Sequence, residues 1–263
     1  MLDERRVALA RQGGGAVAAA QRSSCVVLGV VGARGAAGAS TLAALVAARL
    51  ARRTATVLVD LDVAGGGLDV GVGIEERDGA RWPDLAGARG DLDGRDVLGM
   101  LPRWGPCAVL SADRARPASP EPAVVTDVLH ALAGVVGAVV LDLSRAAVLA
   151  GAAPVAACDL LVLVVPRDLR SVAGALALRP ALVAHGLEPG LVVRGPAPAG
   201  LGVSELVDAI DLPLLWSGRP DRSVAPAGER GLLGVGGRAA CRPAGRAARA
   251  VSAAAWRAGP WAP

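Results

Sequence analysis

The stretch VVLGVVGARGAAGASTLAALVAARLA, residues 26–51, joins three segments of different character. An apolar run from Val26 to Val31 predicts a strand, and a glycine-rich segment from Gly32 to Gly38 follows it. Ser40 and Thr41 come next and open an alanine- and leucine-rich segment with helical spacing. Glycines let a backbone turn tightly around an anion, with successive N–H groups and a helix N-terminus directed at it. This order therefore predicts a phosphate-binding loop.

The loop departs from the common P-loop pattern G-x-x-x-x-G-K-[ST], because Ala39 stands where that pattern has lysine. The whole chain contains no lysine, so all 28 of its basic residues are arginines. No side chain of this protein can therefore supply the ammonium group of an ordinary P-loop. We expect phosphate binding by this loop to depend mainly on backbone N–H groups.

Length and composition indicate one large domain with tails. The chain has 263 residues, of which 53% are apolar but only 2% aromatic, so its core must consist of Val, Leu and Ala. The net charge is +4. Residues 219–257 contain eight arginines but only two acidic residues. The four cysteines form no C-x-x-C pair, which gives no support to a zinc site or a thioredoxin-type motif.

Apolar strand patterns alternate with helical patterns along the chain. Strands are expected at 25–31, 56–61, 108–111, 135–143, 160–165, 190–194 and 212–216, and the main helices at 40–52, 93–101, 124–133, 169–185 and 203–210. Residues 146–166 are mostly apolar, but Pro154 and Asp159 interrupt them, so we expect a helix and then a buried strand rather than a membrane span. The alternation predicts an α/β fold, a doubly wound and mainly parallel sheet flanked by helices.

Acidic residues end two of the expected strands. Asp60 and Asp62 close the strand 56–61, and Asp142 follows four apolar residues in VVLDL, residues 139–143. The carboxyl ends of parallel strands form the ligand-binding edge of such a sheet. A carboxylate there can hold Mg²⁺ or orient a water molecule. For Asp60, a purely structural role at the strand end remains open.

The segments in this order resemble the MinD/ParA superfamily of deviant P-loop NTPases. Similar to that superfamily are residues 32–41 (GARGAAGAST), 57–75, 139–143, 157–175 and 212–231. Within it, the G-A-S-T ending of the loop resembles the CpaE/TadZ-like branch. The stretch RWPDLAGARGDLD, residues 81–93, is similar to the septum site-determining (Ssd, CpaE-like) group.

This resemblance implies a role for each site residue. The residues expected to cradle ATP or ADP are Gly32, Gly35, Ala36, Ala37, Gly38, Ala39, Ser40 and Thr41. The expected Mg²⁺ ligands are Ser40, Asp142 and Asp60. The resemblance implies that Asp62 positions the attacking water, and that Arg34, in the place of a signature lysine, reaches the nucleotide of a partner subunit in an ATP-dependent homodimer. Arginine is a flatter donor than lysine, so this replacement is not neutral.

The resemblance also implies a cytoplasmic protein that finds a pole, a septum or the inner membrane face and recruits division or pilus and secretion proteins there. Membrane contact is expected to be peripheral at most. The domain expected over residues 25–231 is P-loop NTPase-like, preceded by an N-terminal extension, 1–24, and followed by a poorly ordered Arg/Ala/Gly-rich tail, 232–263.

Three functions remain open at this point. The first is an ATP-dependent dimerising switch with weak or absent hydrolysis. The second is a nucleotide-free protein–protein scaffold of the same fold, which would act through surface loops such as 81–93. The third is a ParA-like DNA partition ATPase that uses the basic tail, ranked last because that tail carries no nucleic-acid-binding motif.

Overall fold

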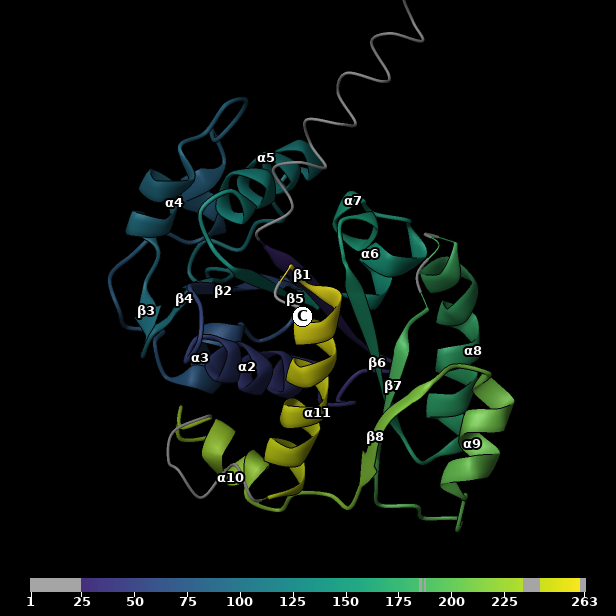
Figure 1. Ribbon diagram of the computed structural model, residues 1–263. Coiled ribbons are helices and arrows are strands. Elements are labelled where there is room, and N and C mark those ends of the chain that lie inside the picture. Colours follow the sequence, from purple (N-terminus) through teal and green to yellow (C-terminus); the bar gives the residue numbers. More distant parts are fainter. Residues whose placement is uncertain (1–24, 185, 187, 234–241, 261–263) are drawn as a thin grey trace, which may run out of the picture.

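The protein is built around one eight-stranded sheet, seen in a computed structural model that describes residues 25–184, 186, 188–233 and 242–260 (Figure 1). The strand order is β3-β4-β2-β5-β1-β6-β7-β8. The strands are β1 (Val26–Gly32), β2 (Thr56–Leu61), β3 (Arg103–Trp104), β4 (Cys107–Leu110), β5 (Ala138–Leu143), β6 (Leu160–Pro166), β7 (Gly190–Arg194) and β8 (Leu214–Gly218). Only the β3–β4 pair is antiparallel among the described strands, which confirms the predicted α/β class.

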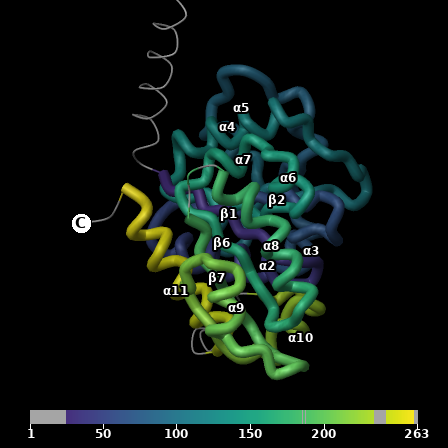
Figure 2. Tube along the Cα trace, turned by 90° about the vertical axis from the view of Figure 1, so that its right-hand side faces the viewer, coloured from purple at the N-terminus to yellow at the C-terminus, as the bar shows by residue number. Residues whose placement is uncertain are grey.

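Helices cover both faces of the sheet (Figure 2). One face carries α2 (Ala39–Leu50), α3 (Leu68–Val72) and α11 (Pro243–Ala258). The opposite face carries η2 (Trp82–Leu85), α4 (Gly94–Met100), α5 (Pro122–Ala133), α6 (Arg145–Leu149), α7 (Ala153–Ala156), α8 (Leu169–Val183) and α9 (Val203–Ile210). The short α10 (Val224–Gly228) lies near α3. The helices in the crossovers between parallel strands therefore cover one face of the sheet or the other.

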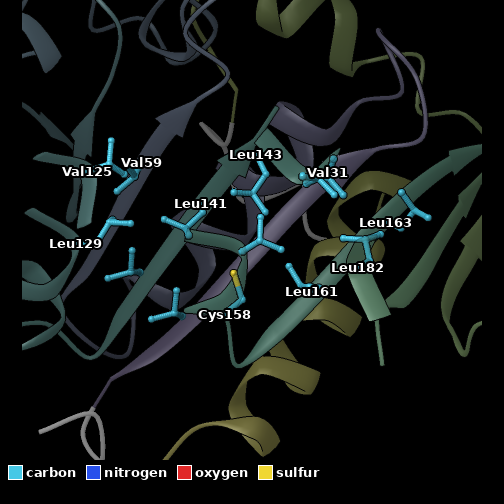
Figure 3. Packing of buried hydrophobic residues seen from close by; sticks show 14 of the residues in the cluster. Val31, Val59, Val125, Leu129, Leu141, Leu143, Cys158, Leu161, Leu163 and Leu182 are labelled. Carbon is cyan, nitrogen blue, oxygen red and sulfur yellow. The ribbon is translucent and has the colours of Figure 1, made fainter. Parts of the chain in front are cut away.

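Strand β1 is the centre of both cores because its seven residues are all buried. Val26, Leu28 and Val30 face the α2 and α11 side, whereas Val27 and Val31 face the other core. Successive side chains of a strand point to opposite faces, so an apolar residue is needed at every position. Figure 3 shows Val31 with Leu143, Leu161 and Cys158 in this second core.

The expected elements occur with small shifts at their ends. The strand expected at 135–143 begins at Ala138, and the helix expected at 169–185 is described as far as Val183. The apolar stretch 146–166 holds two short helices, α6 and α7, and then the buried strand β6, close to the expectation of a helix followed by a strand. Within the described residues, no helix is both long and apolar enough to cross a membrane.

The C-terminal part differs from the expectation of a poorly ordered tail. Residues 243–258 form helix α11, which packs on α2 and along β8 (Figure 1). The buried face of α11 consists mainly of small residues, Ala247, Ala248, Val251, Ala254 and Ala255, which let its backbone approach closely. The guanidinium of Arg53 also lies 5.4 Å from the ring centre of Trp256, a cation–π contact. The extension 1–24 and residues 234–241 and 261–263 lie outside the described residues.

A glycine of α8 sets the distance between this helix and the loop after β1. A Cβ built on Gly174 would overlap the backbone oxygen of Ala33. We therefore expect Gly174→Ala to push α8 from the loop and to lower the free energy of unfolding by about 2–3 kcal/mol. Urea denaturation monitored by circular dichroism measures this change.

Gly99 on α4 is the matched control, because a Cβ built there meets nothing within 4 Å. Gly99→Ala should raise the free energy of unfolding by about 0.5–1 kcal/mol, the usual gain from replacing glycine within a helix. Equal effects of the two substitutions would contradict the close approach of α8 to the loop.

Candidate functional site

A cavity of about 590 Å³ opens at the carboxyl end of β1. In the sheet, β2 lies on one side of β1 and β6, which pairs with β1, lies on the other. The cavity therefore lies at the point where the order of the strands reverses its direction. This is the position at which doubly wound sheets bind ligands. Of the expected site residues, all but Asp60 line it, namely Gly32, Arg34, Gly35, Ala36, Ala37, Gly38, Ala39, Ser40, Thr41, Asp62 and Asp142.

The loop backbone offers this cavity a row of hydrogen-bond donors. Ala36 and Gly38 have positive φ angles of 57° and 93°, which turn the chain tightly before α2 begins. Within the described part of the chain, no hydrogen bond engages the N–H groups of Gly35, Ala36 or Gly38. Residues 39–41 form the first turn of α2, whose N–H groups have no partner inside the helix and no side-chain cap. Together these donors form the cradle that a phosphate group requires.

Ser40 and Asp142 both line the cavity, and their side chains are hydrogen-bonded to each other. Burial raises the pKa of Asp142 to about 7, the hydrogen bond with Ser40 opposes this rise, and the charges of Asp60 and Asp62 add to it. A hydroxyl and a carboxylate are the oxygen ligands that Mg²⁺ takes in nucleotide sites. The two residues therefore fit a magnesium site, and bound Mg²⁺ would neutralise the charge that burial disfavours.

Asp60 has a structural position instead. It is 1% exposed, and its two carboxylate oxygens accept the backbone N–H groups of Asp62 and Leu68, each at 3.0 Å. Its own backbone oxygen accepts the indole N–H of Trp82 at 2.7 Å. The two carboxylate oxygens therefore fix the backbone that follows β2, which is the structural role at the strand end that the sequence left open. For this reason we do not keep Asp60 among the metal ligands. Its contact with Asp62 in turn holds that residue at the cavity.

Arg34, expected to reach a partner's nucleotide, is bound within its own chain. Its guanidinium forms an ion pair with Asp168 at 3.0 Å and donates to the hydroxyl of Ser171 at 3.0 Å. Burial acts to raise the pKa of Asp168, but the hydrogen bonds from Arg34 and Ser171 outweigh it and lower this pKa. These in-chain partners orient the Arg34 side chain toward α8, although the side chain is still 39% exposed.

Two further arginines reach the loop and were missed from the sequence. Arg145, at the start of α6, donates to the backbone oxygen of Ala33. Arg194, the last residue of β7, donates to the backbone oxygen of Ala36 at 3.3 Å. Arg194 could have been suspected, because it ends an expected strand at the ligand edge of the sheet. Nothing in the local sequence marked Arg145.

Comparisons with solved structures decide the fold family. A ParA family ATPase from Chlorobium tepidum TLS superposes with a TM-score of 0.72 at 19% identity and covers 89% of this chain and 98% of its own. The cell division ATPase MinD of Pyrococcus furiosus gives 0.71 at 18% identity, covering 87% and 99%. This chain has the MinD/ParA fold. The septum site-determining protein MinD from Pyrococcus horikoshii OT3, complexed with Mg-ADP, gives 0.67 at 17% identity, covering 88% and 94%.

Comparison of sequences finds relatives with a higher sequence identity than these solved structures. No protein-family model matches the chain. Two uncharacterized proteins of Mycobacterium tuberculosis, MT3760 and Rv3660c, are each 41% identical to it over 213 residues. These matches cover 79% of this chain but only 58% of each relative, so the chain spans little more than half the length of the curated relatives it matches.

The stretch 81–93, which carried the finer resemblance, begins with residues that stabilise this MinD/ParA fold. Arg81 is 6% exposed, forms an ion pair with Asp69 at 3.6 Å and donates to three backbone oxygens. Trp82 is 1% exposed and its indole N–H donates to the backbone oxygen of Asp60 in β2, which anchors the stretch to the sheet. Only the segment 86–93 that follows is largely exposed.

The raised pKa of Asp142 predicts a pH-dependent stability. An unfolded aspartate ionises near pH 4, whereas folded Asp142 keeps its proton up to about pH 7. The folded state therefore loses stability relative to the unfolded state as the pH rises from 4 to 7, by up to about 4 kcal/mol. Asp142→Asn cannot ionise and should avoid this loss.

The measurement is urea denaturation of both proteins at pH 4 and pH 8 without Mg²⁺. From pH 4 to pH 8 the free energy of unfolding of Asp142→Asn should rise relative to that of the wild type, because the variant lacks the ionisation that destabilises the folded state. A stability difference that does not change with pH would show that Asp142 ionises normally in the folded protein.

Proposed function

We propose that this chain is a MinD/ParA-like nucleotide-binding positioning protein with a degenerate Walker A loop and weak or absent ATP hydrolysis. The observation that carries the proposal is the row of N–H groups, unpaired within the described residues, at the start of α2, in the same cavity that the Ser40–Asp142 pair lines. The nucleotide would be ATP or ADP. Ser40 and Asp142 would hold Mg²⁺, which supplies positive charge to the phosphates, and Asp62 would position water.

The missing ammonium group affects binding and hydrolysis differently. A hydrogen bond to a charged group contributes about 1.5–3 kcal/mol, so its loss weakens binding without abolishing it. Loss of a donor that stabilises the transition state lowers the rate by roughly 10²–10³. We therefore expect binding that is micromolar or weaker, together with very slow turnover.

The proposal extends to assembly and place in the cell. Release of Arg34 from Asp168 would free it for the nucleotide of a second copy, giving a homodimer on ATP binding. The exposed segment 86–93 is suited to recruiting a partner, because the buried residues Arg81 and Trp82, which precede it, anchor its N-terminal end to the domain. We propose a CpaE-like or Ssd-like role at a septum, a pole or a pilus or secretion assembly.

A nucleotide-free scaffold is the second candidate, favoured by Ala39 in the lysine position and by the in-chain partner of Arg34. Partition on DNA is the third. It is supported by one cluster of arginines, in which burial and then the charges of Arg249, Arg53 and Arg52 lower the pKa of Arg49. Salt-sensitive binding to non-specific DNA would be its signature.

Restoring the lysine tests the nucleotide proposal. Isothermal titration should show weak binding of MgATP and MgADP to the wild type. Ala39→Lys should tighten it about 10- to 100-fold, because the loop regains a charge-assisted donor. Ala86→Lys is the matched control, since it adds the same charge at an exposed position outside the cavity.

Two results would overturn the proposal in different ways. No heat and no thermal shift with either nucleotide, even for Ala39→Lys, would favour the scaffold. Fast ATP turnover by the wild type that Asp62→Ala abolishes would contradict the expected loss of hydrolysis.

A further inference from the structure

Arg194 lies directly beside the phosphate-binding loop although it belongs to a distant part of the chain. It ends β7, and its guanidinium donates to the backbone oxygen of Ala36 at 3.3 Å. A Cβ built on Gly38 would lie 3.5–3.6 Å from the Cζ, Nε and Nη1 atoms of Arg194. The side chain also lines the cavity. A cation thus lies next to position 39, where the loop has alanine in place of lysine.

The hydrogen-bonding capacity of Arg194 is not used up. Its Nε atom is buried and has no hydrogen-bond partner among the described residues. None of the described carboxylates forms an ion pair with it. Burial, followed by the positive charge of Arg34, lowers the pKa of Arg194. A half-buried cation with a free donor and a cationic neighbour needs an anion, because an unpaired buried donor costs about 1–3 kcal/mol.

The two other arginines at the loop are worse placed for this task. Arg34 already has a carboxylate partner, Asp168, at 3.0 Å. Arg145 contacts Ala33 at the start of the loop, and its Nη1 atom would be 3.1 Å from a Cβ on Gly174, so it is packed between α6, α8 and the loop. Neither has a buried nitrogen without a hydrogen-bond partner.

We infer that Arg194 is the phosphate-binding cation of this site and supplies from β7 the positive charge that position 39 lacks. This inference rests on the proposed nucleotide function and names the residue that makes it workable. Guanidinium binds phosphate through two parallel hydrogen bonds, so a change of the Arg194 side-chain rotamer would bring its Nε atom, which is buried, and one Nη atom to a single phosphate group. Arg194 then joins the N–H groups of the loop in neutralising the phosphates.

Titration calorimetry with MgADP tests the inference on the full chain. Arg194→Gln should weaken MgADP binding about 10- to 100-fold, and Arg194→Lys should recover part of the loss because it keeps the charge. The salt dependence of binding should become less steep in Arg194→Gln, since one charge contact is gone. Arg95→Gln is the control, because Arg95 is exposed on α4 outside the cavity.

Inorganic tripolyphosphate, which has no base or ribose, separates a phosphate contact from other roles. It should compete with MgADP on the wild type and compete far less well on Arg194→Gln. Unchanged MgADP binding by Arg194→Gln would overturn the inference. So would a loss that lysine does not repair and that leaves tripolyphosphate competition intact, since Arg194 would then only brace the loop or contact the base. Absence of MgADP binding by the wild type would instead refute the proposed function.

Discussion

In residues 33–41, arginine side chains bind several backbone carbonyl groups, whereas the N–H groups of Gly35, Ala36, Gly38 and the first turn of α2 have no partner among the described residues, and the site depends on this division. The oxygens of Ala33, Gly35 and Ala36 each accept a hydrogen bond from an arginine, namely Arg145, Arg34 and Arg194. Arg34 belongs to the loop itself, whereas Arg145 and Arg194 come from distant parts of the chain. Because the carbonyls are engaged in this way, the loop can present unpaired donors to the cavity without losing its shape. The hydrogen bonds from these arginines therefore stabilise the conformation of the loop.

Negative charge is organised on the other side of the same cavity. Asp60, Asp62 and Asp142 lie close enough that the first two raise the pKa of the third. Both Asp60 and Asp142 are buried, and burial raises the pKa of each, but two backbone N–H groups stabilise the carboxylate of Asp60, whereas the hydroxyl of Ser40 is the hydrogen-bond partner that opposes this rise at Asp142, which lines the cavity. Asp142 is therefore the group whose ionisation a bound cation would favour. Arginines around the loop and acids beneath it form the arrangement that a magnesium–nucleotide complex would complement.

Regular patterns in the sequence predicted much of this architecture. The all-apolar strand 26–31 could be interpreted as central because a strand buried on both faces has no polar positions. Most of the expected cavity residues are contiguous in the sequence, and for that reason a local motif found them. Arg194 and Arg145 were missed because each contacts the loop from more than a hundred residues away. Helix α11 was missed because its buried face is alanine, which has no strong apolar pattern.

The sequence by itself determined the doubly wound sheet, the glycine-rich loop after its first strand and the absence of any lysine in that loop, since periodicity, glycine spacing and composition are local properties. Only the tertiary structure decided which partners the charged residues have. It gave Asp60 two backbone partners, paired Arg34 with Asp168 and placed Arg194 over Gly38. These outcomes depend on distances between strands and helices that are far apart in the chain, and no local pattern of residues encodes such distances.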